Sequence, residues 1–356
     1  MEDEIEVLLK LSSIKGIGEA KLKRLISRFT PISKVFDADR YELSNLVGGD
    51  FVPSIKVARK KNVEPELAVL KKLGVNLVTF EKPSYPANLK PLSNIPPFLY
   101  VRGEILPSDQ EAIAIIGSRR ASPYGKFVAE KFAHDFALRG LTIVSGLARG
   151  IDTCAHEGAL KAGGRTIAVL GCGIDIVYPR ENSTLMQSII SHGACISEFP
   201  LGTQPLAGNF PARNRLISGL SRAVVVIEAT TQSGVFSTVG WALEQGKEVF
   251  AVPGNITSET SKGVNRLIMD GAQPATSPQD VLEYLGIKPI TEEEGKLKLS
   301  DDERRMFNLL NYEPKGLDNL SETLNFSIPK VLNILLDLEL RGIVKQLPGR
   351  NFVRNI

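Results

Sequence analysis

Residues 112–152 read AIAIIGSRRASPYGKFVAEKFAHDFALRGLTIVSGLARGID, and this stretch decides the fold class. It begins with a short apolar run, Ala112–Ile116, continues through an amphipathic stretch of helical length at 124–139, and reaches a second run at Leu141–Val144. Two apolar runs joined by a helix are typical of a βαβ unit with parallel strands. A glycine follows soon after each run, as Gly117 and Gly146.

The same alternation continues along the chain. Further apolar runs are Thr166–Leu170, Ala194–Ser197, Ala223–Ile227 and Glu248–Val252, with helix-length amphipathic stretches at 151–162 and 235–245. The pattern predicts an α/β fold built on a Rossmann-like, doubly wound, mostly parallel sheet. In such a sheet the ligand crevice lies beyond the carboxyl ends of the strands. The residues after each run are therefore the candidates for function.

Composition narrows the class of protein. The chain has 356 residues with 43 Lys+Arg and 40 Asp+Glu, a net charge of +3, so any DNA-binding surface must come from local clustering. It contains no apolar run of about 18 residues, and its acidic N-terminus is unlike a signal peptide. Three cysteines form no even disulfide framework, which favours a cytoplasmic location.

Smaller zones flank the predicted sheet. Residues 1–65 read as a small all-α domain, in which Lys15-Gly16-Ile17-Gly18 resembles a helix-hairpin-helix turn that either holds a phosphate or simply joins two helices. Residues 66–287 form the Rossmann-like domain, and the charged stretch 288–300 reads as a linker. Residues 301–356 carry three helical stretches and a hairpin around Pro348-Gly349-Arg350-Asn351, which predicts a winged helix.

The winged-helix hairpin is basic. Residues 341–356 contain Arg341, Lys345, Arg350 and Arg354 and no acidic residue. Such a wing suits phosphate contact, but the same charges also suit an ordinary solvated hairpin or a module that binds protein.

Three turns after the predicted strands suit an anionic ligand. Their small residues and arginines offer backbone N–H groups, a hydroxyl and guanidinium groups: Gly117, Ser118 and Arg119 after the first run, Gly146 and Arg149 after the second, and Gly173 after the third. Each turn alone has an ordinary structural explanation. Three turns at one sheet edge favour a phosphate-binding site.

The fourth connection is the most informative. No acidic residue occurs from Phe199 to Ile227, and within it Phe210, Arg213, Asn214 and Arg215 suit phosphates and one stacked base. Phe210 could equally be a core anchor beside a proline turn. Hydroxyl-bearing and small residues after the next strand, Ser233, Gly234 and Thr238, again suit phosphate.

Several enzyme signatures are absent from the sequence. It has no P-loop, no Gly-x-Gly-x-x-Gly after a strand and no Gly-x-Ser-x-Gly nucleophile elbow. Its three histidines, His134, His156 and His192, are scattered, so we expect no metal site, no catalytic residue and no cofactor. We interpret His156 as a packing or hydrogen-bonding residue.

Together these motifs resemble the DNA-processing protein A family (DprA, also called Smf). The resemblance rests on GSR at 117–119, SGLARGID at 145–152, Tyr178-Pro179 with Asn182, FPARNRLISGLS at 210–221, and AVPGN at 251–255 with Asn265. It covers most of 70–286 and extends to both flanking zones.

The resemblance implies a function. The family binds and protects single-stranded DNA, loads the recombinase RecA during natural transformation, acts as a homodimer through the Rossmann-like domain, and is not known as an enzyme. By motif match, Arg119 would clamp a phosphate, Phe210 would stack a base, and Arg213 and Arg215 would hold the backbone. Ser233, Gly234, Thr238 and Asn265 would line the same groove. The stretch PLAGN before Phe210 lacks a basic residue often found there.

Two alternatives stay open. One is a nucleotide-binding enzyme related to nucleoside monophosphate phosphoribohydrolases, although the stretch Thr230–Glu244 lacks their Pro-Gly-Gly turn. The other is a nucleotide-sensing scaffold whose winged helix binds duplex DNA.

Overall fold

The structure is a computed structural model that describes residues 4–287, 299–310, 314–341 and 343–354. The chain divides into two compact units, Met1–Lys288 and Pro289–Ile356, and each is described by itself. Most of the predicted linker 288–300 lies outside the described residues. No helix in the described ranges is both long and apolar enough to span a bilayer.

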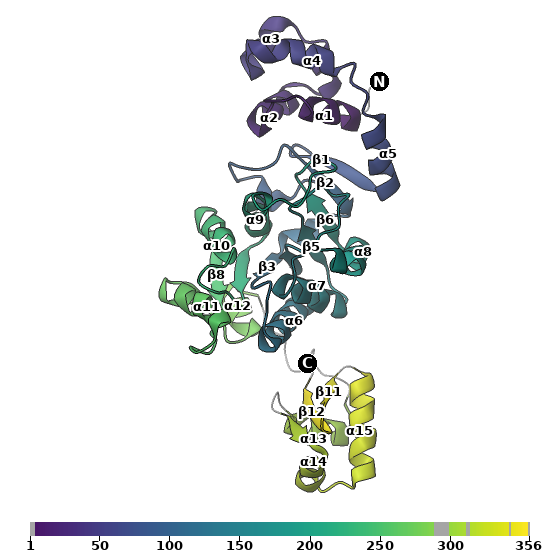
Figure 1. Cartoon of the computed structure of the whole chain (residues 1–356), viewed down its shortest axis with the longest axis vertical. Coiled ribbons are helices and arrows are strands. Elements are labelled where there is room, and N and C mark those ends of the chain that lie inside the picture. Colours follow the sequence, from purple (N-terminus) through teal and green to yellow (C-terminus); the bar gives the residue numbers. More distant parts are fainter. Residues whose placement is uncertain (1–3, 288–298, 311–313, 342, 355–356) are drawn as a thin grey trace. The chain divides into compact units, whose positions relative to one another are not determined.

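The first unit is built on a nine-stranded sheet in the order β1-β2-β6-β5-β4-β3-β7-β8-β9 (Figure 1). Strands from β6 to β9 in this order pair in parallel, and β2 and β1 add an antiparallel edge. The strands are β1 (Val75–Thr79), β2 (Phe98–Gly103), β3 (Ala112–Ile116), β4 (Thr142–Ser145), β5 (Thr166–Val169), β6 (Ala194–Ser197), β7 (Ala223–Val226), β8 (Glu248–Ala251) and β9 (Gln273–Pro274). The predicted fold class is confirmed, and the six apolar runs are β3 to β8.

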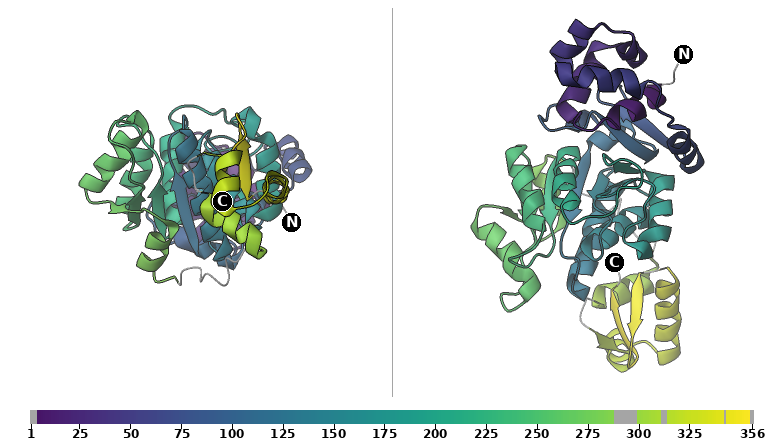
Figure 2. Two further views of the ribbon diagram at one scale, coloured as in Figure 1. Left: turned by 90° about the horizontal axis from the view of Figure 1, so that it is seen from below. Right: turned by 45° about the horizontal axis from the view of Figure 1, so that its top comes forward.

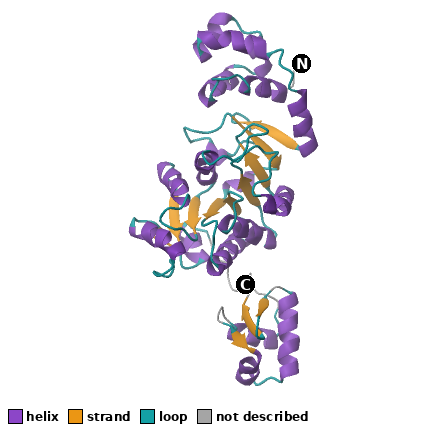
Figure 3. Ribbon diagram, viewed as in Figure 1, coloured by secondary structure: helices purple, strands orange, loops and turns teal. Residues whose placement is uncertain are grey.

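Helices cover both faces of this sheet (Figures 2 and 3). They are α6 (Pro123–Leu138), α7 (Ile151–Lys161), α8 (Ser183–His192), α9 (Asn209–Leu220), α10 (Val235–Glu244), α11 (Glu259–Met269) and α12 (Pro278–Tyr284). Ile113, Ile115 and Ile143 pack against α6, α7 and α12. The opposite faces of the same strands pack against α9, α10 and α11. Both faces are therefore buried, which explains why these strands are continuous apolar runs.

The connection order creates a switch point in the sheet. From β3 the chain adds β4, β5 and β6 on one side, then returns to add β7 and β8 on the other side of β3. The loops after β3 and β7 consequently leave the sheet in opposite directions. A crevice opens between such loops at the carboxyl ends of the strands.

Five helices precede the sheet: α1 (Glu4–Ser12), α2 (Glu19–Arg28), α3 (Arg40–Val47), α4 (Val52–Ala58) and α5 (Glu64–Leu73). The predicted domain boundary at residue 65 falls inside α5. One hydrophobic cluster also includes residues from α1 to β5 and α8, on both sides of that boundary. The boundary therefore stays a prediction. At the Lys15–Gly18 turn, Lys21 of α2 donates to the Gly16 carbonyl at 3.5 Å and lies over the Phe51 ring. This lysine next to the turn thus has local partners.

The second unit combines three helices with a three-stranded sheet in the order β10-β12-β11. Its elements are α13 (Asp301–Leu309), β10 (Lys315–Gly316), α14 (Leu317–Leu324), α15 (Ile328–Leu340), β11 (Val344–Leu347) and β12 (Asn351–Arg354). Three helices and a hairpin are the winged-helix arrangement predicted from the sequence. The hairpin turns through Gly349 and Arg350, both at positive φ.

Candidate nucleic-acid interface

A cleft of about 820 Å³ opens at the switch point of the sheet. Its walls come from the loops after β3, β4 and β7, the start of α9, and Tyr178. Of the residues predicted for the site, those lining it are Gly117, Ser118, Arg119, Phe210, Arg213, Asn214, Ser233, Gly234 and Thr238. The fold therefore brings together residues from three separate motifs, the first and last of which lie more than 100 positions apart in the chain.

The loop after β3 is held rigidly while its arginine stays accessible. The Ser118 N–H donates to the Glu228 carbonyl at 2.8 Å, and the Ser118 hydroxyl accepts from the Arg120 N–H at 3.1 Å. The Arg119 side chain is exposed, and within the described ranges it forms no ion pair. A fixed loop with a free guanidinium is suited to bind a phosphate.

An aromatic pair stands next to that guanidinium. The Arg119 Cζ lies 5.0 Å from the centre of the Phe210 ring, and the Tyr178 ring centre lies 5.7 Å from that of Phe210. Tyr178 is 38% exposed and Phe210 is half-buried. Gly171 makes room for this ring, because a Cβ there would lie 2.7 Å from Phe210 Cδ1. Accessible aromatic faces beside a cation can stack a base and hold its phosphate.

Arg213 is mainly a structural residue of the cleft wall. It is 4% exposed and donates to the carbonyls of Gly146, at 2.9 Å, and Val169. Burial lowers the pKa of Arg213 to about 10, so the guanidinium remains charged at neutral pH. Its charge opposes the effect of burial, which raises the pKa of the Asp152 carboxyl. Asp152 in turn accepts from the Gly146 and Ala148 N–H groups, at 3.1 and 3.3 Å, and fixes the loop after β4.

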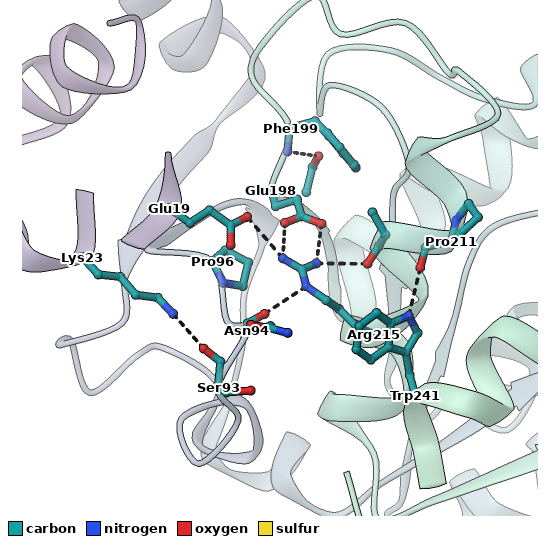
Figure 4. Close-up of polar contacts among 12 residues, drawn as sticks. Glu19, Lys23, Ser93, Asn94, Pro96, Glu198, Phe199, Pro211, Arg215 and Trp241 are labelled. Atoms are coloured by element: carbon teal, nitrogen blue, oxygen red, sulfur yellow. Dashed lines mark hydrogen bonds and ion pairs between the residues drawn. The ribbon is translucent and has the colours of Figure 1, made fainter. Parts of the chain in front are cut away.

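Arg215 is not among the residues that line the cleft, and its polar contacts are drawn in Figure 4. Its side chain is 9% exposed and pairs with both oxygens of Glu198, each at 2.6 Å. Residues two apart on a helix point in nearly opposite directions, so Arg213 and Arg215 of α9 cannot both face one ligand. The helical character of 209–220 was the signal that could have separated them.

Four other predicted residues lie at the margin or elsewhere. Gly146 and Arg149 line a small recess beside the cleft, where the exposed Arg149 forms an ion pair with Glu181, with one contact at 2.8 Å. Gly173 donates its N–H to the Thr203 carbonyl at 2.9 Å, and Asn265 pairs with the Gly254 backbone at 3.1 and 2.9 Å. Neither Gly173 nor Asn265 is among the residues that line the cleft.

Sequence reasoning missed the buried carboxylate beneath the cleft. Glu228 is 3% exposed and accepts from the Ser122 N–H and hydroxyl at 2.9 and 2.6 Å, and from the Thr260 hydroxyl at 3.1 Å. It thereby ties the end of β7 to the starts of α6 and α11. Thr230 and Thr260 also line the cleft and were not predicted, because isolated threonines carry no motif.

The described residues contain no cluster of three or more His, Cys, Asp or Glu residues able to hold a metal. His156 is fully buried, contacts the Thr166 hydroxyl at 2.6 Å, and has its pKa lowered to about 3 by burial. Burial raises the pKa of Cys154 and of Cys172 to about 11, which keeps both thiols protonated.

The winged-helix unit uses half of its predicted basic residues internally. Arg341 pairs with Glu303 at 2.7 Å, and Arg354 donates to the Phe307 carbonyl at 2.9 Å. Lys345 and Arg350 remain exposed. One stripe of the exposed side of α15 is apolar, formed by Ile328, Leu332, Leu336 and Leu340. Exposed polar side chains, Lys330, Asn333 and Asp337, lie beside it.

The sequence of this chain matches family models and relatives of known name. A model of DNA recombination-mediator protein A matches residues 76–286, and a model of the DprA winged helix domain matches 269–350. Protein Smf of Escherichia coli is 39% identical over 300 residues, which cover 82% of this chain and 80% of that protein.

Two solved structures are similar to this one. The structure of DNA processing protein A from Streptococcus pneumoniae superposes with a TM-score of 0.68 at 33% identity, and covers 80% of this chain and 98% of its own. A Helicobacter pylori DNA processing protein A, described by its single-stranded DNA binding mode, superposes at 0.54 with 34% identity, and covers 59% and 95%.

Proposed function

Because this chain belongs to the DNA recombination-mediator protein A family, we propose that it binds single-stranded DNA in the cleft at the switch point of the sheet. Family membership makes it a DNA-processing protein. The observation that supports this ligand is the grouping of Arg119, Phe210 and Tyr178: an exposed guanidinium, without an ion pair among the described residues, lies over the Phe210 ring, and Tyr178 lies beside that ring. The similar Helicobacter pylori protein, whose title describes single-stranded DNA binding, supports the same ligand.

The binding mode follows from the groups in the cleft. Arg119 and Arg120 are exposed cations of the cleft, and the hydroxyl-bearing residues Thr230, Ser233 and Thr260 also line it. Cations and hydroxyls bind phosphate oxygens, and the rings accept any base because every base has a π face. Duplex DNA keeps its bases stacked inside the helix and cannot present one to Phe210. We therefore expect a preference for single strands with little sequence specificity.

Fluorescence anisotropy tests this proposal. Labelled oligo-dT and a duplex of equal length are titrated with the full chain at low and at physiological salt. We expect tight single-strand binding that weakens as salt rises, since phosphate contacts release counterions. Equal affinity for the duplex, or no single-strand binding, would overturn it.

The finer role follows the family resemblance. We propose that the protein protects incoming single strands in the cytoplasm during natural transformation, loads RecA onto them, and forms a homodimer through the Rossmann-like unit. The assay is RecA-dependent strand exchange on DNA precoated with single-strand-binding protein, with and without this chain. Acceleration of exchange supports loading, and an unchanged rate contradicts it.

We propose that the protein acts by binding and not by catalysis. The enzyme alternative would require a catalytic group in the stretch Thr230–Glu244, but Glu244 is exposed at the end of α10 and does not line the cleft. Incubation with nucleoside monophosphates should release no free base. Release of base would restore the enzyme interpretation.

A further inference from the structure

We propose that Arg215 is a positioning residue for the DNA cleft, and that Glu19 makes the N-terminal helices part of the same apparatus. This inference rests on the proposed single-stranded DNA binding. The motif resemblance would make Arg215 a phosphate ligand. Its contacts assign it a different task.

All five N–H donors of the Arg215 guanidinium have protein acceptors. Nε donates to the Asn94 carbonyl at 2.9 Å, Nη1 to Glu198 at 2.6 Å and to the Ala212 carbonyl at 3.1 Å. Nη2 donates to Glu198 at 2.6 Å and to Glu19 at 3.3 Å. An arginine has no further donor to offer, so a phosphate could bind only by displacing one of these partners.

These partners fix the helix that carries the cleft aromatic. Glu198 directly follows β6, and Asn94 lies in the loop before β2. Arg215 stands on α9, directly after Asn214 and in the turn that follows Phe210. A bidentate carboxylate pair defines the orientation of a guanidinium, and here it defines the position of α9 relative to the sheet. A site of this kind works only when its supporting contacts hold the ligand groups in place.

Helix α2 adds two further contacts to this arrangement (Figure 4), and none of its residues lines the cleft. Glu19, which is half-exposed, reaches Arg215, and the Lys23 ammonium donates to the Ser93 carbonyl at 3.4 Å. Glu19 therefore contacts Arg215 of α9 directly. Lys23 contacts the loop before β2, which also accepts a hydrogen bond from Arg215 through Asn94. The N-terminal helices therefore stabilise the position of α9 without touching the cleft.

The two possible roles of Arg215 predict opposite changes in DNA affinity when a glutamate beside it loses its charge. If Arg215 binds phosphate, then removing the negative charge of Glu198 or Glu19 frees the guanidinium and strengthens DNA binding. If Arg215 positions α9, the same changes weaken DNA binding, although they make the protein more positive.

The test measures oligo-dT affinity of the full chain for wild type, Glu198→Gln and Glu19→Gln across a salt series, together with thermal unfolding. Glu42→Gln is the matched control, because Glu42 pairs with Arg28 inside the N-terminal helices at 2.5 Å. We expect Glu198→Gln to bind about tenfold and Glu19→Gln about threefold more weakly, with the salt slope unchanged. The control should bind like wild type or slightly tighter.

A third variant, Arg215→Lys, keeps the positive charge but removes the planar guanidinium that makes the bidentate pair with Glu198. Positioning predicts a loss of about tenfold, whereas a phosphate ligand would retain near wild-type affinity. Equal or tighter binding by the glutamate variants would overturn the inference, as would a lower melting temperature with unchanged affinity. Glu19→Gln keeps the test decisive if a buried variant fails to fold. Failure of wild type to bind oligo-dT would instead overturn the proposed function.

Discussion

Replacing Arg119 by alanine should weaken single-stranded DNA binding while leaving the fold intact. The side chain is exposed and within the described ranges makes no ion pair, so its removal breaks no internal network. Losing one charge-assisted hydrogen bond to phosphate costs about 1.5–3 kcal/mol, which corresponds to a loss of roughly 10–150-fold in affinity. The lost cation–π contact with Phe210 adds at most about 1 kcal/mol at this exposed site.

Salt dependence identifies the cause of that loss. Each phosphate contact to a single strand contributes about 0.7 to the slope of log K against log salt, so the slope of Arg119→Ala should fall by about that amount. Lys131→Ala is the control, since Lys131 pairs with Asp135 on α6 at 3.2 Å and does not line the cleft. Anisotropy with oligo-dT provides both affinity and slope. Equal effects of the two substitutions would refute the assignment of the site.

Three further outcomes are expected. Phe210→Ala should weaken oligo-dT binding by about 1–3 kcal/mol with the salt slope unchanged, because stacking releases no counterions; a reduced slope in anisotropy titrations would contradict this role. Removing residues 297–356 should leave single-strand affinity within a few-fold of wild type, and its loss on truncation would move the site to the winged helix. His156 stays neutral when folded, its pKa lowered to about 3 by burial, whereas the unfolded state takes up a proton below its ordinary pKa of 6.5. The free energy of unfolding therefore decreases as the pH is lowered, and His156 accounts for about 1.4 kcal/mol of that decrease between pH 7.5 and 5.5. Urea unfolding at the two pH values should show this decrease. In the His156→Gln variant the decrease should be smaller by that amount.

The sheet was predictable because burial on both faces leaves a plain signal. Strands β3 and β6 begin and end where the apolar runs do. The antiparallel edge, Val75–Thr79 and Phe98–Gly103, was not predicted as strands. A proline-rich connection separates the two, and no helix marks a βαβ unit between them. The two-residue strands β9 and β10 are too short for any periodicity.

The candidate site was predictable as a set of loops, but not residue by residue. Order along the chain places Gly117-Ser118-Arg119 and the start of α9 at one sheet edge, and the cleft lies there. Helical spacing could place Arg213 and Arg215 on opposite sides of α9, but the sequence could not say which of the two faces a ligand. The carboxylates whose charges act on them are Asp152, at the start of α7, and Glu198, directly after β6. Which arginine is free for a ligand depends on those tertiary contacts.

Photo-crosslinking with iododeoxyuridine in a single strand tests the location of the ligand most directly. The substituted base reacts with aromatic side chains it stacks on, and mass spectrometry identifies the linked peptide. We expect adducts on Phe210 or Tyr178, and their loss in Arg119→Ala at limiting protein concentration. Adducts confined to the winged-helix hairpin 344–354, with none on the cleft aromatics, would contradict single-strand binding at the switch point of the sheet.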